Sequence, residues 1–237
     1  MKKSIFAIIA ANAGAAIVLV QRHFSYLSGH TASRAIDGDD VFARNYSELE
    51  PSVLFLCDKA GIERGWQHGK AWADSGFQNV NVVASHQGRG PDSGIRISEG
   101  FHAETGLWLP VSCHRAVDYP AYNHAPALKA LKEDGDPMTA KWLNGKRNDL
   151  IKSDTPRSFK GRVTGFVEDL LERSEGITLI STHFELCVLI HSLYVEGKDL
   201  GEVSEAYSPQ KGGGILIVRH EDGTTVSYDY DAELNVM

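Results

Sequence analysis

The chain has 237 residues, of which 42% are hydrophobic, so it can bury a large core, and one domain over 1–237 is the default expectation. Its formal net charge of −7 and the lack of any Lys/Arg block argue against nucleic acid as a partner. Cys57, Cys113 and Cys187 are too widely spaced for a CxxC metal motif and too few for a disulfide framework.

The N-terminal segment allows two interpretations. An apolar run at 4–11 follows two lysines and leads into small residues, as in a minimal export signal cleaved near Ala13–Ala15, which would make the protein periplasmic or secreted. The segment is at the short limit for such signals, so we favour a cytoplasmic protein whose N-terminal segment packs on the core. Neither a transmembrane helix nor a membrane partner is expected, because no separate apolar run reaches about 20 residues.

Predicted strands and helices alternate along the chain. Buried strands rich in β-branched residues are expected at 16–20, 79–84 and 177–181. Helices are expected at 49–76, where three glycines loosen the pattern, and at 91–104, 127–131 and 156–175. A short strand at 107–111 and a hairpin of 212–218 with 224–230 complete the set. This alternation predicts an α/β fold, a three-layer sandwich in which helices cover both faces of a mostly parallel sheet.

Polar residues follow the three buried strands. Arg22-His23 comes after the first, Ser85–Arg89 after the second and Thr182-His183 after the third. Ligands collect beyond the carboxyl ends of parallel strands, so these side chains are expected to form one site. A histidine beside an arginine that can grip an oxyanion suits chemistry on phosphate.

In order and setting, these residues resemble the histidine phosphatase superfamily over roughly Ile17 to Tyr194. In that family the first strand ends in Arg-His-Gly, a later strand in Ser-x-x-x-Arg, and a second histidine follows a late apolar strand. The segments VLVQRHF, SHQGR and ITLISTH match these three features. The resemblance implies a phosphoglycerate mutase-like fold and a phosphatase that hydrolyses a phosphate monoester through a phosphohistidine, with no metal and no cofactor.

The resemblance also implies a role for each site residue. His23 would attack phosphorus through a neutral ring nitrogen, while Arg22, Arg89 and His183 would bind the phosphate oxygens. The other ring nitrogen of His23 must be held by a hydrogen bond, for which a carbonyl is expected but not located. The leaving group needs a proton, and Asp118 fits the expected position of the acid, whereas Glu104 comes too early.

The chain departs from the family at several positions. Phe24 and Phe184 replace the glycine that commonly follows each histidine, and the segment at 25–29 lacks the Glu-Ser and Asn of the mutases. These departures favour hydrolysis over a mutase-type phosphotransferase, and they leave an inactive phosphate-binding relative as an alternative. If the two strand ends are neighbours, Phe24 and Phe184 are expected to touch ring to ring.

The remaining histidines are expected to be structural or exposed. Arg219-His220 repeats the Arg-His pair but precedes a hairpin, so it is expected at a surface turn. His86 and His124 could line the mouth of the pocket. The expected partner is a small phosphorylated substrate or a phosphoprotein; the specificity loops at 30–47 and 139–154 contain no recognisable motif, and the sequence leaves the oligomeric state open.

Overall fold

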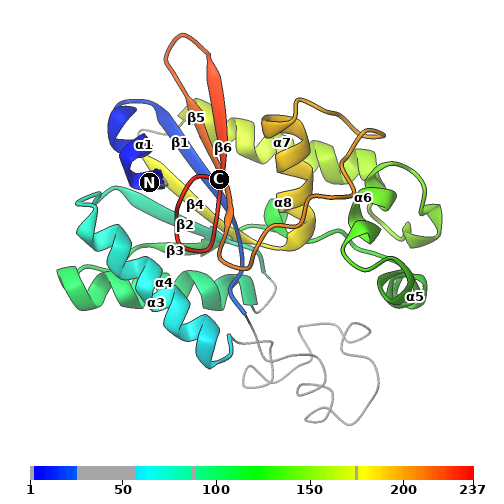
Figure 1. Cartoon of the computed structure of the whole chain (residues 1–237), viewed down its shortest axis with the longest axis horizontal. Helices are drawn as coiled ribbons and strands as arrows, with labels where there is room; N and C mark the ends of the chain where they lie inside the picture. The colour runs from blue at the N-terminus through cyan, green and yellow to red at the C-terminus, as the bar shows by residue number, and fades with distance from the viewer. Residues whose placement is uncertain (1–2, 26–56, 87–88, 174–175) are drawn as a thin grey trace.

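A six-stranded sheet forms the centre of the molecule, with the strand order β3-β2-β4-β1-β5-β6. The computed structural model describes residues 3–25, 57–86, 89–173 and 176–237 (Figure 1). The parallel strands are β1 (Ala16–Arg22), β2 (Val80–Ala84), β3 (Val111–Cys113) and β4 (Ile177–Thr182). The antiparallel hairpin of β5 (Gly214–Arg219) and β6 (Thr225–Tyr230) lies along the free side of β1.

Helices cover both faces of this sheet (Figure 1). One face is covered by α1 (Ile5–Ala11), α3 (Lys59–Asp74) and α4 (Arg89–Thr105). The other is covered by α5 (His124–Asp134), α6 (Pro137–Leu143), α7 (Pro156–Arg173) and α8 (Phe184–Ile190). Short turns of other helix types are η3 (Arg115–Val117), η4 (Asn148–Leu150) and the π-helical η5 (His191–Val195). The predicted α/β three-layer sandwich with a mostly parallel sheet is confirmed.

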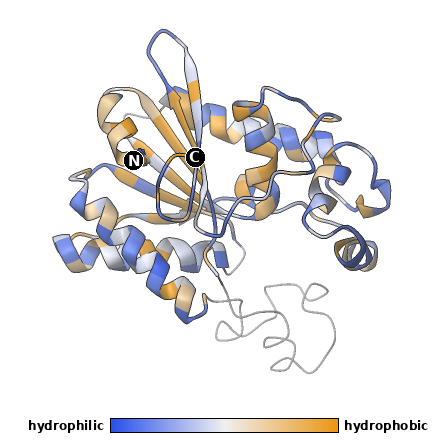
Figure 2. Ribbon diagram, viewed as in Figure 1, coloured by the Kyte–Doolittle hydropathy of each residue, from blue (hydrophilic) through white to orange (hydrophobic). Residues whose placement is uncertain are grey.

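The apolar strands have a partner on each face. Along β1, Val18 and Val20 belong to the core under α7 and α8, whereas Ile17 and Leu19 belong to the core under α1 and α4. Successive strand residues point to opposite faces, so a central strand with helices on both sides must be apolar throughout. Figure 2 shows this as an orange band of strands between mixed helices.

Glycines let α3 and α4 pack backbone to backbone. A Cβ on Gly69 would stand 2.1 Å from the carbonyl oxygen of Ile97, and one on Gly100 would stand 2.1 Å from that of Trp66. The glycines of α3, expected to loosen this helix, instead form its contact surface, because only a residue without a side chain permits so close an approach.

Several element boundaries differ from the prediction. The strand expected at 107–111 is Val111–Cys113, because Val111 is the first of its residues to pair with β2. The helix expected at 127–131 is the longer α5, and α6 occupies part of the segment expected to be a specificity loop. The start of α3 is set by Asp58, whose carboxylate accepts the N–H of Gly61; the earlier part of the helix expected at 49–76 lies largely outside the described residues.

The N-terminal helix α1 is part of the fold. Its buried residues Ile5, Ile8 and Ile9 join the core on the α3–α4 face. The N–H of Ile5 donates to the carbonyl of Leu234, so α1 is also tied to the C-terminal segment. None of the helices in the described parts of the chain is both long and apolar enough to cross a membrane.

Candidate active site

The strand register brings both predicted histidines to one edge of the sheet. Arg22, the last residue of β1, pairs with Thr182, the last residue of β4. The N–H of His23 donates to the carbonyl of Thr182, and the rings of His23 and His183 lie 5.4 Å apart, centre to centre. Two residues separated by most of the chain therefore share one site, as the strand-end argument predicts.

His23 is held in a single tautomer. Its Nδ1–H donates to the main-chain oxygen of Phe24 over 2.7 Å, and since a carbonyl can only accept, the neutral ring carries its proton on Nδ1. Burial, then the charges of Arg89, His183 and Arg22, keep the pKa of His23 well below its ordinary value, although the bond to Phe24 acts in the opposite direction. At neutral pH the Nε2 atom is therefore an unprotonated lone pair.

His183 is oriented by the turn after β2. The hydroxyl of Ser85 and Nε2 of His183 are 2.7 Å apart, and both residues are buried. A Cβ on Gly90 would come within 2.5 Å of that hydroxyl, which explains why the second residue of α4 is a glycine. Burial and the charges of Arg89 and Arg22 hold the pKa of His183 well below its usual range. The ring of Tyr119 meets His183 edge to face at 5.3 Å.

Both predicted arginines flank the histidines. The guanidinium of Arg22 lies over the ring of Phe184 at 4.9 Å, and its Nη1 donates to the carbonyl of Pro209. Its Nε is buried and finds no hydrogen-bond partner among the described residues, an unusual state for such a donor. Arg89 is buried at the start of α4, where its positive charge acts on both histidines. The arrangement concentrates positive charge in a chain whose net charge is negative.

Asp118 lies beside the turn that carries Arg89. Its Oδ1 accepts the main-chain N–H of His86 over 2.6 Å and stands 3.5 Å from the His86 ring. The preceding residue, Val117, accepts the Thr182 hydroxyl through its carbonyl oxygen. The segment that carries Asp118 is therefore fastened both to the end of β4 and to the turn after β2.

The expected ring contact between Phe24 and Phe184 is wrong. Phe24 packs in the core on the α3–α4 face, edge to face with His68 at 4.9 Å, whereas Phe184 packs against the core on the other face. Adjacent strand ends do not bring the next side chains together here, because the chain turns to opposite faces of the sheet after His23 and His183.

Other candidate residues are distributed over the molecule. Glu104 forms an ion pair with Lys70 on the surface of α3 and α4. Arg219 lies at the opposite end of β5 from Gly214 and pairs with Glu168, in agreement with a surface role for Arg219-His220. The side chain of His124 lies outside the described residues, as does the segment 30–47.

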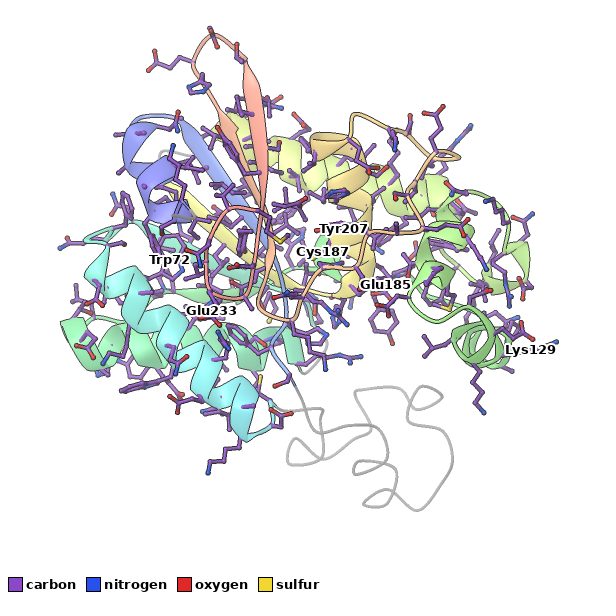
Figure 3. The ribbon with its side chains drawn as sticks, in the orientation of Figure 1. Trp72, Lys129, Glu185, Cys187, Tyr207 and Glu233 are labelled. Carbon is purple, nitrogen blue, oxygen red and sulfur yellow. The ribbon has the colours of Figure 1, made fainter. Side chains whose placement is uncertain are left out.

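Glu185, in the first turn of α8, is a carboxylate that was not predicted to belong to the site (Figure 3). Burial raises its pKa, while the charges of Arg89 and Arg22 act in the opposite direction. The signal was an acidic residue two positions after the second histidine, at the start of a helix, where a carboxylate is favourable.

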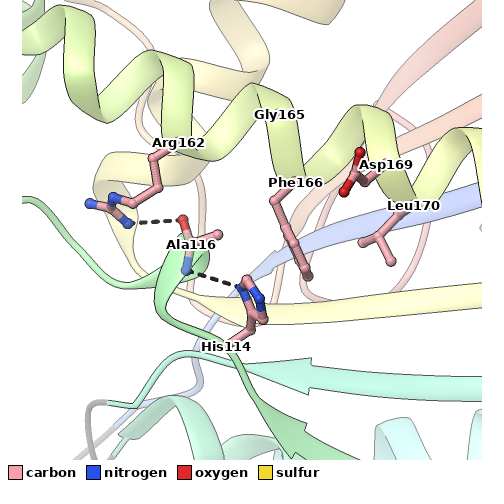
Figure 4. A pocket seen from close by; sticks show the side chains of 7 residues that line it. All are labelled: His114, Ala116, Arg162, Gly165, Phe166, Asp169 and Leu170. Atoms are coloured by element: carbon pink, nitrogen blue, oxygen red, sulfur yellow. Dashed lines mark hydrogen bonds between the residues drawn. The ribbon is translucent and has the colours of Figure 1, made fainter.

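A hollow lies between the η3 turn and α7 (Figure 4). It has a volume of about 350 Å³ and includes the stacked rings of His114 and Phe166. Across the described parts of the chain, no three His, Cys, Asp or Glu side chains gather in a way that could hold a metal ion.

Comparison with solved structures identifies the fold. Phosphoglycerate mutase from Bacillus anthracis aligns over 95% of this chain and 97% of its own, with a TM-score of 0.57 and 12% identity. A mutant phosphoserine phosphatase from Entamoeba histolytica in complex with phosphoserine gives a TM-score of 0.58 at 9% identity, over 92% and 98% of the two chains. Alpha-ribazole phosphatase from Shigella flexneri gives a TM-score of 0.52 at 15% identity, over 89% of this chain and 93% of its own.

No family model matches the sequence, and no curated protein does either. The similarity therefore lies in three dimensions, and at these identities it shows the fold alone. The predicted phosphoglycerate mutase-like fold is confirmed.

Proposed function

We propose that the protein hydrolyses a phosphate monoester through a phosphohistidine formed on His23. The observation that carries the proposal is the hydrogen bond from Nδ1 of His23 to the Phe24 carbonyl. It leaves Nε2 as an unprotonated nucleophile, in a buried setting between two arginines. The same fold carries phosphatase activity in proteins such as alpha-ribazole phosphatase, which agrees with a phosphatase role.

In this mechanism two arginines neutralise the negative charge of the phosphate before His23 attacks. A phosphate monoester brings two negative charges, and Arg22 and Arg89 offer guanidinium donors that match its oxygens. The unpartnered Nε of Arg22 would gain an acceptor when the ester binds. The Ser85 hydroxyl and Nε2 of His183 are in hydrogen-bond contact. In the proposed mechanism the hydroxyl is the donor, so the ring proton of His183 is on Nδ1 and is donated to a phosphate oxygen.

Two displacements then complete the reaction. In the first, the Nε2 lone pair of His23 forms a bond to phosphorus as the ester P–O bond breaks, and the carboxyl of Asp118 protonates the leaving oxygen. In the second, water attacks phosphorus, its proton passes to the Asp118 carboxylate, and the P–N bond breaks to restore His23. Glu185 is the competing acid, because its raised pKa is what a proton donor needs.

The departures at Phe24 and Phe184 are compatible with activity. The contact that fixes His23 uses the main chain of Phe24, so its side chain is free to pack in the core. Phe184 supports Arg22 with its ring face, a favourable contact for a guanidinium. These contacts favour hydrolysis over a protein that only binds phosphate.

The test is hydrolysis of 4-nitrophenyl phosphate, followed by a screen of phosphosugars, nucleotides and phosphoproteins. We expect His23→Ala to retain less than about 1% of the wild-type activity, since removal of a covalent nucleophile is among the costliest changes in an enzyme. His220→Ala is the matched control, because His220 also follows an arginine at a strand end but lies away from the site, and it should keep full activity.

A labelled substrate adds a second measurement. Phosphohistidine is stable in alkali and labile in acid, so label should remain on the wild-type protein after an alkaline quench and be lost after an acid quench. Residual activity in His23→Ala well above about 1% would contradict the covalent route. Phosphate binding without turnover of any substrate would instead identify a binding protein.

A further inference from the structure

Arg162 on α7 forms hydrogen bonds to three main-chain carbonyls of one short segment. Its Nη1 donates to the carbonyl oxygens of Arg115, Ala116 and Asp118, at 2.8, 2.9 and 3.1 Å. Figure 4 shows Arg162 reaching from the helix to the carbonyl of Ala116. A guanidinium is suited to this task because its donors are fixed in one plane.

The contacts of Arg162 extend past the turn. Its Nη2 pairs with Oδ2 of Asp154 at 3.0 Å, and the same oxygen accepts the N–H of Ala121 at 3.1 Å. Directly through its own donors, and indirectly through Asp154, Arg162 therefore holds the segment 115–121 at both ends. The side chain of Arg162 is 25% exposed, so these bonds are partly shielded from water.

The segment has little regular structure of its own. The η3 turn spans only Arg115–Val117, and its start is capped by Nδ1 of His114, which accepts the N–H of Ala116. The next two residues are Asp118, bonded to the His86 N–H, and Tyr119, in contact with the His183 ring. The position of the proposed acid therefore depends on contacts from outside the segment.

We propose that Arg162 is a positioning residue, which holds Asp118 and Tyr119 against the catalytic histidines by fixing the carbonyls of 115–118. The inference rests on the proposed function for its kinetic consequence, but its structural part is independent of turnover. Arg162 touches neither histidine in the described contacts, so it acts through the segment.

The kinetic test compares a phosphate ester with a poor leaving group, glycerol phosphate, and one with a good leaving group, 4-nitrophenyl phosphate. Arg162→Met should lower kcat/KM for glycerol phosphate by about 10- to 100-fold more than for the aryl ester, since a misplaced acid fails where protonation matters most. Arg162→Lys keeps a charge but not the planar donors, so its kcat/KM for glycerol phosphate should lie between those of the wild type and Arg162→Met. Arg157→Met, an exposed arginine in the first turn of the same helix, is the matched control and should change neither value.

Amide hydrogen exchange gives a readout that needs no activity. In Arg162→Met the amides of His86 and Asp118 should exchange faster, while those of β1 and β4 should not change, and Arg157→Met should match the wild type. Unchanged exchange at His86, or equal kinetic losses with both esters, would overturn the inference. A wild-type protein that hydrolyses neither ester would refute the proposed function instead, and the exchange result would then decide the role of Arg162 by itself.

Discussion

At the scale of single residues, buried histidines determine how the protein responds to acid. His68 is buried beside Phe24, and its Nε2–H donates to the carbonyl of Ala232, while its buried Nδ1 has no hydrogen-bond partner in the part of the chain that the structure describes. Burial lowers the pKa of His68 to about 4; the charge of Arg64 acts in the same direction, and Glu233 and the bond to Ala232 oppose it.

This shift predicts a loss of stability in acid. Between pH 6.5 and 4 the unfolded chain binds a proton at His68 that the native protein does not. The free energy of unfolding therefore has its full value above pH 6.5 and decreases as the pH drops below it. The loss should reach about 3 kcal/mol near pH 4. Urea unfolding of the wild type and of His68→Gln between pH 7 and 4.5 measures it, and parallel stability curves for the two proteins would contradict the assignment.

The identity of the proton donor is testable by the leaving group. Asp118→Asn should reduce hydrolysis of glycerol phosphate by about 100-fold or more and largely spare 4-nitrophenyl phosphate, whose leaving group needs no proton. Glu104→Gln is the control, because Glu104 only pairs with Lys70 at the surface, and it should affect neither ester. If Glu185→Gln shows the selective loss and Asp118→Asn does not, Glu185 is the acid.

The two histidines could be predicted to lie together because each directly follows a buried strand, and the two arginines because Arg22 ends β1 and Arg89 opens the helix after β2. The sequence could not locate the carbonyl that fixes His23, since it belongs to the main chain of the next residue and any residue type would supply it. Glu185 was missed because its raised pKa arises from burial, which a first-turn acidic residue does not reveal. The predicted Phe24–Phe184 contact is wrong because the sequence does not show toward which face of the sheet the chain turns after each strand.

At the scale of elements, some helix glycines allow close packing and others only weaken the helix, and substitution by alanine distinguishes the two. Gly100 in α4 faces the backbone of Trp66, so Gly100→Ala should destabilise the protein by about 1–3 kcal/mol as the two helices are forced apart. Gly165 in α7 is exposed with nothing within 4 Å of an added Cβ, so Gly165→Ala should stabilise it by about 0.5–1 kcal/mol. Thermal unfolding of both variants checks this. If both substitutions shift the melting temperature in the same direction, the packing described for α3 and α4 is contradicted.

Long periodic elements followed the prediction more closely than short ones. The start of α7 at Pro156 and the strand at 177–182 agree with the sequence because a capping residue, a proline and a continuous apolar run mark them. The three-residue β3 was misplaced and the helix α6 was not expected, since β3 is defined by its pairing with β2 and α6 by the core it covers. Such short segments take their structure from contacts that a local pattern does not contain.

At the scale of the whole molecule, α1 links the two ends of the chain. It buries Ile5, Ile8 and Ile9, each worth about 1.5–3 kcal/mol, and it bonds to the segment around Leu234. A chain that begins at Ala16 should therefore unfold several kcal/mol more easily in urea than the full chain. Unchanged stability would contradict the packing of α1.

The intact mass of the protein from its native host shows whether the N-terminal segment is retained or cleaved. We expect the N-terminal segment to be retained, because α1 packs in the core. An intact mass that corresponds to a chain beginning at Gly14 or Ala16 would instead indicate export and cleavage.

The position of β1 in the middle of the sheet also governs when activity can arise during synthesis. Ile17 pairs with Ile177 on one side and with Val218 on the other, so the first strand made must wait for nearly the last. Such distant pairings close late in folding. A growing chain on the ribosome thus carries Arg22 and His23 long before the residues that surround them exist, and the candidate site can assemble only once β4 and the β5–β6 hairpin have been translated.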